Sequence, residues 1–276
     1  MPQPLICFAN VVGIVPAVLL MYYLLKTYDR YLKDIYLAGA LGVGLLLGVM
    51  MFLFHLFIDP IVIYTIDGLI FIYIMGFALF ENITKLMVLN HRIMRGEKGA
   101  SFYGTTLGLG MGITSIMAIA YMDALRDPDA FLKEPLVIPT FIMLAFGFSA
   151  IQGATGAIVG YGAMKGRPWV HLGYAMVAHM VFNTSMAVFI FTEYPGRFAA
   201  ASIVATVGFG ALYLAYVRYL TASLPRSLQV DRRRRLRKGS RKRRRTAGAG
   251  HGTSNDGHED RNDGKKGIGK ARSDRK

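Results

Sequence analysis

The chain has 276 residues, of which 53% are hydrophobic and 18% charged, and its formal net charge is +15. This composition is too apolar for one water-soluble core, so it excludes an ordinary soluble domain and indicates a polytopic membrane protein. The charge belongs to the tail, because residues from Arg218 onward hold 20 Lys and Arg against 6 Asp and Glu. The single cysteine, Cys7, excludes an intramolecular disulfide and any cysteine-based metal cluster.

Seven apolar runs are long enough for a helix of about 20 residues, which spans roughly 30 Å of hydrocarbon. The predicted spans are residues 5–25, 35–58, 61–89, 102–122, 136–164, 170–191 and 198–217. The first lacks the basic start and cleavage site of a signal peptide, so we interpret it as a retained helix. The sequence therefore predicts an all-α bundle of about seven transmembrane helices over residues 1–217.

The loops predict the orientation, because Lys and Arg concentrate on the cytoplasmic side of a membrane. The first, third and fifth loops are basic, and the second, fourth and sixth are neutral or acidic. The basic loop residues are Lys26, Arg30, Lys33, Arg92, Arg95, Lys98, Lys165 and Arg167. We therefore expect a multi-pass protein of the plasma membrane with its amino terminus outside and its carboxyl terminus in the cytoplasm.

The tail divides into a basic juxtamembrane segment, residues 218–245, and a polar segment, residues 246–276, which is predicted to be disordered. The basic segment favours binding to anionic lipid headgroups, where each basic residue adds about 1 kcal/mol. Nucleic-acid binding is a weak alternative, because no aromatic residue is interleaved with the basic ones. The residues predicted to bind lipid are Arg232, Arg233, Arg234, Arg235, Arg237 and Lys238.

Glycines mark two helix faces that are predicted to pack closely. Gly104, Gly108 and Gly112 lie four apart in the fourth span, and Gly156 and Gly160 repeat this spacing in the fifth. Small residues at this spacing let helices approach within a membrane. The partner is either another helix of this chain or a second protein.

Polar residues inside the spans are the candidates for function, because such groups are costly at membrane depth. Glu81, His179 and Gln152 are predicted to lie roughly 12, 14 and 18 Å below the inner boundary, from a rise of 1.5 Å per helical residue. At similar depths on three helices, they can form one cluster. His171 and Trp169 are placed at the inner boundary instead, outside that cluster.

Two helical pairs sharpen the prediction, since residues four apart share a helix face. Glu81 and Lys85 form one such pair, and His179 and Asn183 form the other. Both pairs have structural interpretations, as a buried ion pair and as interhelical hydrogen bonds. In the catalytic interpretation, Glu81 activates water as a general base while His179 and Asn183 stabilise an oxyanion. A divalent metal such as zinc is a further alternative, although fewer than three good ligands are in view.

These residues carry a resemblance to a known family. The segments Glu81-Asn82-Ile83-Thr84-Lys85, Phe148-x-x-x-Gln152 and His179-x-x-x-Asn183 resemble, in order and spacing, the motifs of the PrsW and CAAX-protease superfamily of intramembrane endopeptidases. The resemblance covers residues 61–191. It implies that Glu81 is the catalytic glutamate, Lys85 its basic partner, and His179 with Asn183 the last motif.

Two positions differ from the family pattern. Asn82 stands in place of a second glutamate and Gln152 in place of a histidine, and glutamine cannot shuttle a proton near neutral pH. The chain is also similar to the anterior-pharynx-defective scaffold subunit of gamma-secretase, which has seven spans and a Gly-x-x-x-Gly-x-x-x-Gly helix and does not itself catalyse proteolysis.

Two hypotheses follow. In the first, the protein is an intramembrane peptidase with Glu81 as base and a membrane protein as substrate. In the second, it is a non-catalytic pseudoprotease or scaffold, whose polar cluster fixes helix packing and whose glycine faces seat a partner subunit.

Overall fold

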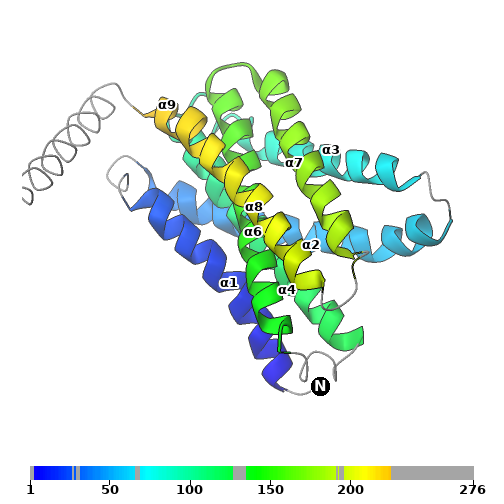
Figure 1. The fold of residues 1–276 in the computed structure, drawn as a ribbon. Helices are drawn as coiled ribbons and strands as arrows, with labels where there is room; N and C mark the ends of the chain where they lie inside the picture. The colour runs from blue at the N-terminus through cyan, green and yellow to red at the C-terminus, as the bar shows by residue number, and fades with distance from the viewer. Residues whose placement is uncertain are drawn as a thin grey trace, which may run out of the picture. The chain divides into compact units, whose positions relative to one another are not determined.

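The computed structural model describes residues 3–26, 28, 32–65, 69–126, 135–190, 192 and 196–224. Seven helices within these ranges are long and apolar enough to cross a membrane, and the described residues form no strand (Figure 1). They are α1 (Gln3–Leu25), α2 (Asp34–Thr65), α3 (Leu69–Leu89), α4 (Ala100–Arg126), α6 (Val137–Met164), α7 (Pro168–Ile190) and α8 (Arg197–Ala215). The predicted all-α membrane bundle is therefore confirmed, and the orientation of its termini stays a prediction.

The helix boundaries depart from the predicted spans at two places. The second helix continues to Thr65 and α3 begins at Leu69, whereas the sequence predicted a break after residue 58. Proline is tolerated within membrane helices, so Asp59 and Pro60 do not end α2. At the other end, α8 continues as a π-helix, η2 (Tyr216–Leu220), and a last turn, α9 (Thr221–Ser223). The rest of the basic segment, with Arg232–Arg235, Arg237 and Lys238, lies outside the described residues.

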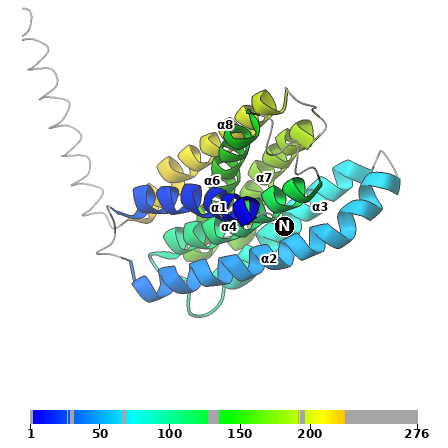
Figure 2. The same ribbon diagram turned by 90° about the horizontal axis from the view of Figure 1, so that it is seen from below.

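The centre of the bundle is formed by α4 and α6, which pack most extensively on each other (Figure 2). The first and second helices cover α4, while α7 and α8 cover α6. The third helix lies at the edge beside α2 and makes its main contacts with α7 and α6. The residues of α3 that face inward therefore reach α6 and α7.

The predicted glycine faces of α4 and α6 lie against each other. A Cβ atom built on Gly104 would lie 2.1 Å from the carbonyl oxygen of Gly156, and one on Gly108 would lie 1.9 Å from that of Gln152. One on Gly160 would meet the carbonyl oxygen of Ala100 at 2.2 Å. These faces are filled within this chain, so a partner subunit would have to bind elsewhere.

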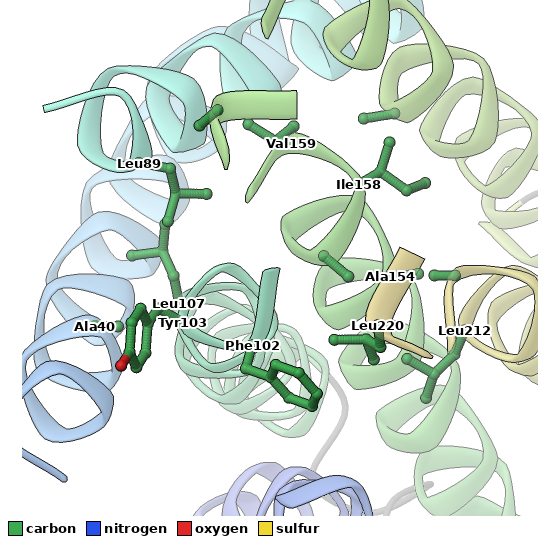
Figure 3. Packing of buried hydrophobic residues seen from close by; sticks show 14 of the residues in the cluster. Ala40, Leu89, Phe102, Tyr103, Leu107, Ala154, Ile158, Val159, Leu212 and Leu220 are labelled. Carbon is green, nitrogen blue, oxygen red and sulfur yellow. The ribbon is translucent and has the colours of Figure 1, made fainter. Parts of the chain in front are cut away.

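Four apolar clusters occur among the described residues, and the two largest fill most of the bundle. Figure 3 shows part of the first, in which Leu89 of α3 packs near Leu107 of α4 and Val159 of α6, with Leu212 of α8 on the far side. The second cluster lies nearer the opposite end and includes Phe141, Ile151 and Phe182. Along α6 and α7, buried residues between the members of these two clusters have apolar neighbours toward both ends of the helix.

Ion pairs mark the two ends of the bundle. Lys33, just before α2, lies 3.0 Å from Glu97, just before α4, which brings the basic first and third loops together. The carboxylate of Glu97 raises the pKa of the Lys33 ammonium by accepting its hydrogen bond. At the other end, Arg197 at the start of α8 lies 3.8 Å from Asp123 of α4. The first ion pair thus places the first and third loops at one end of the bundle.

Candidate functional site

Three helices bring six polar side chains together between the two apolar clusters. Glu81, Asn82 and Lys85 come from α3, Gln152 and Thr155 from α6, and His179 from α7. Glu81 is 3% exposed and the other five are at most 1% exposed. Successive members contact one another, and we call this set the polar chain.

Gln152 joins the two charged residues of α3. Its Nε2 donates to Glu81 Oε1 at 3.0 Å, and its Oε1 accepts from Lys85 Nζ at 2.5 Å. The orientation of the amide is dictated by these neighbours, because a carboxylate can only accept and an ammonium can only donate. Lys85 also donates to Thr155 Oγ1 at 2.7 Å. The glutamine therefore carries the interaction between a buried anion and a buried cation.

Asn82 fixes the tautomer of His179. Asn82 Nδ2 lies 2.7 Å from the carbonyl oxygen of Ala78, so this atom must be the amide donor. The same nitrogen lies 3.1 Å from His179 Nδ1, which must therefore be the acceptor and carry no proton. The ring proton then resides on Nε2, which lies 2.7 Å from Glu81 Oε2. His179 is thus neutral, with its one N–H available to the carboxylate.

The polar chain balances its own charge. Glu81 contributes one negative charge and Lys85 one positive charge, and the other four side chains of the set are neutral. Removing one partner of a buried pair typically costs about 3–5 kcal/mol, because an uncompensated charge remains. Both carboxylate oxygens of Glu81 and both ring nitrogens of His179 already have polar neighbours within the polar chain.

The structure brings together three of the four residues that the sequence placed in the site, namely Glu81, Gln152 and His179. Asn183 lies one turn further along α7, is half-buried, and has no hydrogen-bond partner among the described residues. Thr155 was missed, although its position three residues after Gln152 puts both on one face of α6. The role of Asn82 was also missed, because spacing along α3 does not reveal which side chain α7 presents to it.

The polar chain does not fit a divalent metal. Only Glu81 and His179 are typical ligands, and no group of three or more His, Cys, Asp or Glu side chains occurs among the described residues. The ring nitrogen nearest the carboxylate bears the proton, so it has no lone pair to give. A zinc ion would need two further ligands and a different tautomer.

A groove of about 560 Å³ runs along the surface between α6 and α8, away from the polar chain. It is lined mainly by Met143, Ser202, Thr206, Phe209 and Tyr213. None of the six polar-chain residues lines this groove.

No family model matches the sequence, and comparisons with curated proteins and with solved structures also return no match.

Proposed function

We propose that this integral membrane protein is a non-catalytic relative of the PrsW and CAAX-type intramembrane proteases. On this proposal, the three motif segments have kept their convergence, and their side chains now hold α3 against α6 and α7. The carrying observation is that the Glu81 carboxylate, 3% exposed, has one oxygen bonded to Gln152 and the other beside His179. A general base needs a water molecule and a substrate carbonyl at that place instead.

Gln152 supports the same conclusion. An amide cannot release or take up a proton near neutral pH, so it cannot pass a proton between Glu81 and a leaving group. Its two ends suit a structural bridge, because one end donates to an anion while the other accepts from a cation. The protein then resembles a scaffold that positions a partner in the membrane, with its binding surface outside the filled glycine faces.

A second candidate is an active peptidase, and one observation favours it. Glu81 and His179 lie 2.7 Å apart inside the membrane-spanning region, as an acid–base pair would. In that case Glu81 would accept a proton from the water that attacks a peptide carbonyl, and the proton would pass to the leaving amine.

The two candidates are separated by assaying purified full-length protein in lipid nanodiscs on a panel of membrane-anchored reporter peptides. Glu81→Ala is compared with Glu97→Ala, the same substitution at an end of the bundle. If the protein is a scaffold, the wild type cleaves no more peptide than Glu81→Ala does, and Gln152→His cleaves no more than the wild type. Cleavage by the wild type and by Glu97→Ala, but not by Glu81→Ala, would establish the peptidase instead.

A further inference from the structure

Among the cations at the basic end of the bundle that have no carboxylate partner in the described residues, three lie near a group of aromatic rings. They are Lys165 at the end of α6, Arg167 just before α7, and Arg218 on η2, and all three are exposed. Elsewhere, Lys33 is paired with Glu97 and Arg197 with Asp123. Three like charges without a counterion favour binding of an anion.

Aromatic rings lie beside two of these cations, and the backbone of the third, Arg167, is hydrogen-bonded to one of the rings. The ring of His171 lies 5.4 Å from that of Tyr161 and 5.8 Å from that of Tyr219, and the two tyrosine rings are 5.3 Å apart. The Lys165 ammonium lies over the Tyr161 ring at 5.6 Å, and the Arg218 guanidinium interacts with the Tyr219 phenol. We call the three cations and these three rings the basic–aromatic cluster.

His171 ties the turn before α7 to this cluster. Its Nδ1 lies 2.9 Å from the carbonyl oxygen of Arg167, which can only accept, so Nδ1 carries a proton. The bond fixes the turn that presents the Arg167 side chain. The same ring contacts Tyr161 of α6 and Tyr219 of η2, so it links the turn to two other elements.

The π-helix is a second, independent sign of function at this place. Arg218 and Tyr219 both lie within η2, and the Thr221 N–H bonds to the carbonyl oxygen of Tyr216, five residues back. Single π turns are rare within α-helices and occur frequently at functional sites.

We propose that the basic–aromatic cluster binds the phosphate of an anionic phospholipid headgroup. The cluster lies at the end of the spans where the basic loops meet, and tyrosine and tryptophan are common at this level of a membrane. Trp169, 72% exposed, is close by in the sequence on α7. Basic pockets between helices on the cytoplasmic side are suited to such headgroups.

The surface below the cluster favours a lipid over a soluble phosphate. Val170, Tyr174, Val177 and Val181 follow one face of α7 and are each more than half exposed. This apolar stripe begins at the cluster and continues along the span, so an acyl chain can lie along it while the headgroup meets the cations. A free phosphate would gain nothing from the stripe.

The test measures binding of short-chain phosphatidylglycerol to the full-length protein in detergent, with short-chain phosphatidylcholine and inorganic phosphate as comparison probes. The lipid affinity of the cluster variant, Lys165→Gln/Arg167→Gln/Arg218→Gln, is compared with that of a second triple variant, Lys26→Gln/Arg92→Gln/Arg95→Gln. The second variant is a matched control, because it removes three exposed charges from the same end of the bundle. Elution as a single species shows that each variant is folded, and Arg218→Gln alone replaces the triple variant if that fails.

The cluster variant is expected to bind phosphatidylglycerol about tenfold more weakly or worse, since each basic residue near an anionic headgroup contributes. The control variant should change the affinity by less than about twofold, and phosphatidylcholine should bind weakly to every form. With Arg218→Gln alone, a loss of about threefold or more supports the site and an unchanged affinity overturns it. Equal losses in the two triple variants would overturn the proposal, as would competition by inorganic phosphate as effective as that of the lipid.

Discussion

At the scale of single residues, Asn82 determines which nitrogen of His179 carries the proton. The Ala78 carbonyl oxygen fixes the amide donor, and the amide donor fixes Nδ1 as an acceptor. Asn82 Oδ1 is buried without a hydrogen-bond partner among the described residues. The Asn82 side chain therefore makes its hydrogen bonds only as a donor, through Nδ2. Asn82 thus has a structural role in this chain, because it holds the His179 ring through one hydrogen bond.

Replacing Asn82 with leucine keeps most of the volume and removes the donor. We expect the single Nε2–H tautomer of His179 to give way to a mixture, with a loss of about 1–2 kcal/mol of unfolding free energy. Nitrogen-15 NMR of selectively labelled histidine reports both ring nitrogens directly. The control is Asn183→Leu, which should leave the His179 signals unchanged; an unaltered spectrum in Asn82→Leu would refute the tautomer assignment.

At the scale of elements, the contact between α4 and α6 depends on the absence of side chains at the glycines. In Gly108→Ala the new methyl would lie 1.9 Å from the Gln152 carbonyl oxygen, so the helices must separate. We expect a loss of about 1–3 kcal/mol, measured as a lower unfolding temperature.

Gly173 on α7 provides the matched control, because a Cβ there meets no atom within 4 Å. Alanine at this position should be neutral or stabilise α7 by up to about 1 kcal/mol, since glycine is a poor helix former. Equal destabilisation by the two substitutions would show that the close approach at Gly108 is not what holds these helices.

The elements themselves were largely predictable, because run length and hydropathy alone separate seven spans from their loops. The boundary between α2 and α3 was not, since Asp59 and Pro60 look like a break and the structure continues the helix to Thr65. For the site, equal depth indicated that Glu81, Gln152 and His179 can meet. Which side chain lies between Glu81 and Lys85 depends on how α6 is rotated against α3, and spacing within α3 carries no information on that.

At the scale of the whole molecule, charge is arranged by position along the bundle. The ends carry exposed cations and ion pairs, while the middle encloses one anion and one cation linked by Gln152. With apolar clusters above and below this layer, neither charge can recover its solvation if its partner is lost. The stability of the bundle therefore depends on keeping both charges or removing both.

The coupling free energy between positions 81 and 85 tests this account most directly. Unfolding of the purified protein is compared for the wild type, Glu81→Gln, Lys85→Met and the double variant. Each single variant should lose about 3–5 kcal/mol, because it leaves one buried charge uncompensated. The double variant should lose clearly less than the sum of the two. Additive losses, or single variants as stable as the wild type, would contradict the claim that the polar chain holds the helices together.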